Sequence, residues 1–68
     1  MIYNVTKNSL HNSVIEFIND FGIIPKGTIG YCHAIENGVA YIWLKEPILN
    51  MNNFNFKVDE LIKYIKTK

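Results

Sequence analysis

Residues 28–44, with the sequence TIGYCHAIENGVAYIWL, decide the fold because they hold two strand-forming runs around one turn. On both sides of Glu36-Asn37-Gly38, β-branched and aromatic residues alternate with small or polar ones. That period-two pattern is typical of half-buried strands. Asn-Gly between two such runs is the strongest short signal for a hairpin. The sequence therefore predicts an antiparallel hairpin that turns at residues 36–38.

The length of this turn decides which side chains share a face of the hairpin. If Asn37 and Gly38 form a two-residue type I′ turn, Cys32 lies opposite Trp43. If residues 36–38 instead form a three-residue loop with a glycine bulge, Tyr31 lies opposite Trp43. A slip of one residue moves every side chain to the other face.

We favour the bulged register, in which Ile35 pairs with Val39 and His33 faces Tyr41. This register collects small and aliphatic side chains in the interior, namely Gly30, Cys32, Ala34, Ala40, Ile42 and Leu44. The opposite surface then carries cross-strand pairs of rings together with two aliphatic residues, namely Tyr31, His33, Ile35, Val39, Tyr41 and Trp43.

Helical patterns flank the hairpin and predict an α+β fold. Over residues 9–21 apolar residues recur at spacings of three and four, which predicts an N-terminal helix that ends at Gly22. Over residues 59–66, Asp59 as a cap and the following apolar residues predict a short C-terminal helix. The remaining expected elements are a strand at Met1–Val5, the end of the second hairpin strand at Pro47, a polar loop at 50–53 and a strand at 54–58.

The 68 residues allow one domain, residues 1–68, with its β core at about 25–58. The single cysteine excludes an internal disulfide. No apolar run is long enough to span a membrane, and the N-terminus lacks a signal-peptide pattern. These features predict a cytoplasmic protein. A bias toward AT-rich codons suggests a bacterial or phage gene.

Residues 25 to about 61 resemble small SH3-like barrel proteins. The matching segments are Pro25-Lys26-Gly27-Thr28-Ile29-Gly30-Tyr31-Cys32, the returning strand Ala40-Tyr41-Ile42-Trp43-Leu44, and Val58-Asp59-Glu60-Leu61. In that family such segments open the first long strand, return as a hairpin, and lead from a closing strand into a turn. The resemblance implies a small antiparallel β-barrel or sheet, to which the two helices would be added. It implies no particular activity, because these barrels serve many functions.

Nothing in the sequence favours catalysis or a cofactor. Cys32 and His33 are adjacent in an expected strand and therefore point to opposite faces, which disfavours a nucleophile–base pair. The two histidines and the cysteine lack a metal-ligand spacing. No pair of carboxylates lies in an apolar context that would raise a pKa. We therefore expect no enzyme, no catalytic residue, no bound metal and no cofactor.

The aromatic residues exceed what a small core needs, and they predict a partner-binding surface made of Tyr31, His33, Tyr41 and Trp43. The leading hypothesis is a non-catalytic protein–protein interaction module, for example a small bacterial or phage inhibitor of a partner protein. The alternative is nucleic-acid binding, with rings stacking on bases and lysines contacting phosphates. A net charge of +1 and the absence of arginine weigh against that alternative. A third hypothesis is a subunit that works only as a homo-oligomer.

Overall fold

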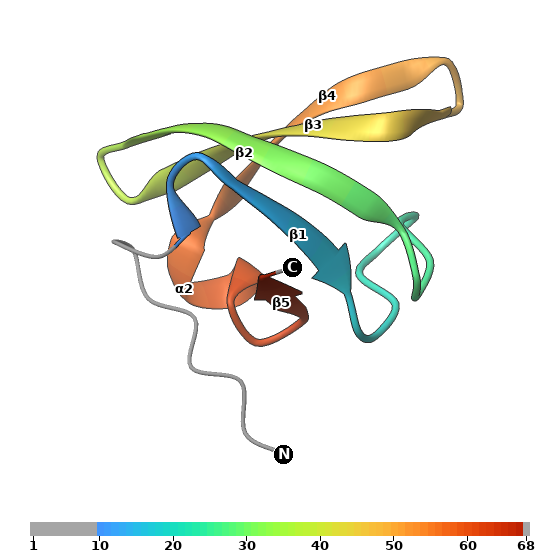
Figure 1. The fold of residues 1–68 in the computed structure, drawn as a ribbon, viewed down its shortest axis with the longest axis horizontal. Coiled ribbons are helices and arrows are strands. Elements are labelled where there is room, and N and C mark those ends of the chain that lie inside the picture. The colour runs from blue at the N-terminus through green and yellow to red at the C-terminus, as the bar shows by residue number, and fades with distance from the viewer. Residues whose placement is uncertain (1–9, 68) are drawn as a thin grey trace.

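The computed structural model describes residues 10–67, which form five antiparallel strands and one four-residue helix (Figure 1). The strands are β1 (Ser13–Phe17), β2 (Ile29–Glu36), β3 (Val39–Ile48), β4 (Met51–Lys57) and β5 (Ile65–Thr67), and the helix is α2 (Val58–Leu61). They make one sheet in the order β4-β3-β2-β1-β5. Because β5 returns from α2 to pair with β1, the sheet is compatible with a small β-barrel-like fold.

The predicted helix at residues 9–21 is wrong, because Ser13–Phe17 form strand β1. Ile15 and Phe17 are fully buried, whereas Val14 before them is exposed and Glu16 between them is half-buried, and this is the period of a strand. The helical interpretation matched Val14 and Phe17 to a spacing of three and left Ile15 unexplained. The predicted strand at Met1–Val5 lies outside the described residues.

The predicted C-terminal helix at 59–66 is also wrong in its extent. Helix α2 ends at Leu61, and its N-cap, Lys57, makes no side-chain capping bond. The chain then turns, with the Tyr64 N–H donating to the Leu61 carbonyl at 2.9 Å, and enters β5. There Ile65 pairs with Phe17 of β1 and is buried. With one four-residue helix among residues 10–67, the α+β prediction gives way to a mostly β fold.

The hairpin between β2 and β3 combines parts of the two registers considered above. Glu36 pairs with Val39 across a two-residue turn in which Asn37 (φ 52°) and Gly38 (φ 76°) are both left-handed, as type I′ requires. The predicted three-residue loop is therefore wrong. The extra residue is His33, because the pairing shifts between Cys32 and Ala34.

This bulge restores the favoured pairing of Tyr31 with Trp43. Beyond it, Ala34 rather than His33 pairs with Tyr41, and Ile35 pairs with Ala40. Ile35 consequently packs against the core, contrary to its predicted position on the outer surface. The bulge thus places Ala34 on the outer side with Tyr41 and Ile35 on the core side with Ala40. The other residues of the predicted interior keep their positions.

Strand β3 continues past Pro47 to Ile48, so the predicted strand end at Pro47 and the predicted loop at 50–53 are both wrong. Strand β3 pairs with β2 only as far as Leu44, and its pairing with β4 is irregular between Trp43 and Ile48. Proline is tolerated there because no regular ladder needs its missing N–H. Figure 1 shows β3 and β4 extending beyond β2 as a two-stranded arm.

The core lies between the sheet and α2, which contributes Val58 and Leu61 to it. Its fully buried members come from every strand except β4, and from α2 and the loops, and they are Leu10, Ile15, Phe17, Ile24, Cys32, Ala40, Ile42, Leu44, Val58, Leu61 and Ile65. Strand β4 adds the half-buried Phe54 and Phe56, and Phe56 makes an edge contact with Phe21 at 4.8 Å between ring centroids. Within residues 10–67, no helix has the length and apolar character needed to cross a membrane.

Candidate functional site

The side of the sheet opposite the core carries a row of apolar and aromatic side chains, which we call the aromatic face (Val14, Tyr31, His33, Tyr41 and Trp43). Backbone alternation along β3 creates it, because Ala40, Ile42 and Leu44 enter the core, and Tyr41 and Trp43 between them turn outward. The register then places Val14 beside Tyr31 and Tyr31 beside Trp43, across three adjacent strands. All four residues predicted from the sequence therefore meet on one surface.

The aromatic face is open to solvent. Trp43 is 43% exposed and Val14 is 42% exposed, whereas Tyr31 and Tyr41 are half-buried by their neighbours. The Tyr31 hydroxyl lies 3.3 Å from the Asn12 Oδ1 atom and donates to it, which fixes one ring at the edge of the row. Helix α2 contributes Val58 and Leu61 to the core and thus lies on the opposite side of the sheet.

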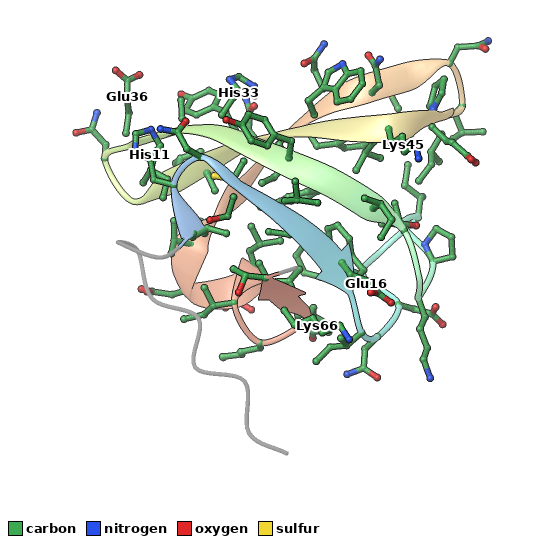
Figure 2. All side chains as sticks on the ribbon, viewed as in Figure 1. His11, Glu16, His33, Glu36, Lys45 and Lys66 are labelled. Atoms are coloured by element: carbon green, nitrogen blue, oxygen red, sulfur yellow. The ribbon has the colours of Figure 1, made fainter. Side chains whose placement is uncertain are left out.

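His33 projects from the bulge and is exposed. Its ring centroid lies 6.4 Å from that of Tyr41, at the outer limit of aromatic contact. Figure 2 shows Glu36 and His11 at the turn end of the hairpin, His33 farther from the turn along β2, and Lys45 toward the other end of the sheet. The bulge therefore extends the aromatic face toward the turn with one polar ring.

The polar surroundings of the aromatic face are asymmetric. Asn53 pairs with Trp43, Asn55 pairs with Tyr41, and Lys57 pairs with Val39, so strand β4 borders the rings with two amides and one cation. On the opposite border, the Lys66 Nζ atom lies 3.9 Å from the Glu16 Oε1 atom (Figure 2). The side next to β4 is thus uncharged or positive, and the side next to β5 carries a balanced ion pair.

The thiol of Cys32 is not part of this surface. It is fully buried on the core side and lies 3.6 Å from the Ala34 carbonyl oxygen, to which it donates. Burial raises the pKa of the Cys32 thiol, because it disfavours the charged thiolate. His33 is exposed on the other side, so the two residues do not form a nucleophile–base pair. Residues 10–67 contain no group of three His, Cys, Asp or Glu side chains that could hold a metal ion.

A cleft of about 390 Å³ lies between the segment before β2 and the outer part of β3. Gly27, in the turn before β2, is left-handed, with φ 93°. The cleft could not be predicted from the sequence, because it arises only where β3 continues past Leu44 beside this turn. The lining residues are Pro25, Lys26, Gly27, Thr28, Ile29, Lys45, Glu46, Pro47 and Ile48.

Comparison of the chain with protein-family models, with curated proteins and with solved structures found no match in any of the three.

Proposed function

We propose that this chain is a non-catalytic protein–protein interaction module that binds a partner protein through the aromatic face. The observation that carries the proposal is the position of Trp43, which is 43% exposed beside Tyr31 on the side opposite the core. Trp and Tyr dominate interface hot spots because they bury a large area when they enter a partner's pocket. The amides and the lysine of β4 then supply the polar rim that surrounds such a hot spot.

The proposal extends to the fold family and the setting. We infer an SH3-like barrel, and three features support it: a five-stranded antiparallel sheet, the Lys26-Gly27-Thr28 turn before β2, and the direct passage of β4 into the helix that holds Asp59-Glu60-Leu61. A chain of 68 residues with one such surface suits a small cytoplasmic modulator or inhibitor of bacterial or phage origin.

Binding of single-stranded nucleic acid is the second candidate. It is favoured by the neighbouring rings of Tyr31 and Trp43, on which bases could stack, and by Lys57 at the border of the same face. The net charge of +1 and the absence of arginine weigh against it, since phosphate contacts dominate nucleic-acid affinity. Protein binding is therefore the stronger proposal.

The test compares capture by three immobilised proteins: the wild type, Trp43→Ala, and Leu49→Ala as the control. Leu49 is 74% exposed at the tip of the β3–β4 arm, away from the aromatic face. We expect the wild type and Leu49→Ala to retain the same protein from a lysate of the native host, and Trp43→Ala to lose it. Equal retention by all three would contradict the proposal.

A salt titration with mixed single-stranded DNA separates the two candidates. Counterion release makes nucleic-acid binding fall steeply with salt, whereas an apolar protein interface responds weakly. Binding of DNA that falls steeply with salt and requires Trp43 would replace the protein-binding proposal with the second candidate.

A further inference from the structure

We propose that the free edge of β4 pairs, antiparallel, with β4 of a second copy of this chain, so that two sheets join into one. This edge borders the aromatic face, because Asn53 and Asn55 of β4 pair with Trp43 and Tyr41, and its pairing with a second copy goes beyond the proposed function. It rests on three properties of β4: an edge that no other strand of residues 10–67 covers, outward-pointing backbone groups, and a sequence that is complementary to itself.

Strand β4 is an edge strand of seven residues, and among residues 10–67 its only strand partner is β3. Natural edges are normally blocked by a proline, an inward-pointing charge or a very short strand. Met51–Lys57 has no proline, and its inward side chains are Asn52, Phe54 and Phe56. Its one charge, Lys57, lies at the end of the strand. Nothing in the strand itself prevents a further strand from adding to it.

The direction of the backbone groups follows from one hydrogen bond. The Val58 N–H donates to the Gly38 carbonyl at 2.9 Å, so Gly38 and Val58 form a hydrogen-bonded pair. Pairs alternate along an antiparallel ladder, and the register from Val39–Lys57 to Trp43–Asn53 is continuous. The N–H and C=O groups of Asn53, Asn55 and Lys57 therefore point away from β3, toward the free edge.

One antiparallel register uses the whole strand. It places Phe54 opposite Phe54 of the second copy, Asn53 opposite Asn55 of the second copy, and Met51 opposite Lys57 of the second copy. Outward-pointing backbone groups then meet outward-pointing groups, as a ladder requires. Asn side chains pair with each other, and the lysines of the two copies lie at opposite ends. No like charges face each other.

Exposed apolar surface beside this edge also favours a second copy of the chain as the binding partner. Phe54 and Phe56 border a small apolar hollow of about 190 Å³ together with Phe21, Ile23 and Ile24. Ile23 is 52% exposed. A second copy in the register above brings its own Phe54 against this strip, which gives an aromatic cross-strand pair and covers apolar surface in both copies.

Two double variants test the register through charge. In Asn53→Lys/Asn55→Lys, lysine faces lysine across the junction twice, whereas in Asn53→Lys/Asn55→Glu, lysine faces glutamate twice. Both positions are exposed and their side chains lie outside the core, so the folds should match by circular dichroism. We expect sedimentation analysis to show a wild-type dimer. We also expect the Lys/Lys variant to raise the dimer dissociation constant about tenfold and the Lys/Glu variant to keep it near wild type.

A wild-type protein that stays monomeric at every concentration would overturn the proposal. A dimer dissociation constant that is the same in both double variants would also overturn it.

A second measurement needs no variant. Amide exchange at Asn53, Asn55 and Lys57 should slow as the protein concentration rises, because these N–H groups gain partners. Exchange at Phe54 and Phe56 should be slow throughout, because their N–H groups already face β3. Fast exchange of the first three amides in concentrated protein would exclude pairing at this edge.

Discussion

Replacing Ile42 with alanine removes three carbon atoms from a side chain that is fully buried between β2 and β4. At about 0.8 kcal/mol for each buried carbon, the transfer term is roughly 2.4 kcal/mol. The cavity left behind adds to it, so we expect a total loss of about 3–4 kcal/mol. An unstapled domain of this size has a stability of roughly 3–5 kcal/mol, so Ile42→Ala should leave little net stability.

The matched control is Trp43→Ala, one residue further along β3 and on the opposite face. Because Trp43 is 43% exposed, its loss should cost about 1 kcal/mol, the typical effect of a point substitution. Urea denaturation followed by far-ultraviolet circular dichroism gives the free energy of unfolding of both variants. The comparison requires that the free energy falls with urea concentration at the same slope in both. A larger loss for Trp43→Ala than for Ile42→Ala would refute the assignment of faces.

Further predictions concern the hairpin and its thiol. A Cβ atom at Gly30 would lie 3.1 Å from the Ile42 Cγ2 atom, so Gly30→Val should lower the free energy of unfolding by about 1–3 kcal/mol; an unchanged melting temperature would contradict this packing. Gly38 has φ 76°, so Gly38→Ala should cost about 1–2 kcal/mol in urea titrations and Gly38→Asn less, and equal losses would argue against the type I′ turn. Burial raises the pKa of Cys32, so a thiol reagent should react with the folded protein at least about tenfold more slowly than with the protein in urea. Because the folded pKa of Cys32 lies above the unfolded one, its contribution to stability is complete below the unfolded pKa and is lost as pH rises through the folded one. Cys32→Ala should therefore lose less stability than the wild type between neutral and alkaline pH.

The hairpin could be predicted from the sequence because its signals are local. Asn37-Gly38 specifies a tight turn, and the alternating runs beside it specify two strands. The bulge at His33 has no local signal. It lets the short type I′ turn coexist with a pairing that sends Cys32 inward and Trp43 outward, and only the packing of the whole sheet selects it. The predicted site residues lie on one face because the pairing of Tyr31 with Trp43 was predicted correctly, although the favoured three-residue turn was wrong.

The helices were mispredicted because short apolar segments satisfy two periods at once. Residues 13–17 contain Val14 and Phe17 at a helical spacing, and Ile15 and Phe17 at a strand spacing. Pairing with β2 and β5 decides in favour of the strand, since it buries Ile15 and Phe17 and satisfies the backbone of β1. Ile65 is buried by the same pairing, which ends α2 after one turn. Partners far apart in sequence overrode local propensity at both ends.

The affinity of Trp43→Ala for the captured partner tests the central claim most directly, measured by calorimetry beside a melting curve of the same variant. We expect a folded protein whose dissociation constant rises about thirtyfold or more, which corresponds to about 2 kcal/mol for a hot-spot residue. A folded Trp43→Ala variant that binds the partner as tightly as the wild type would show that the aromatic face is not the binding surface.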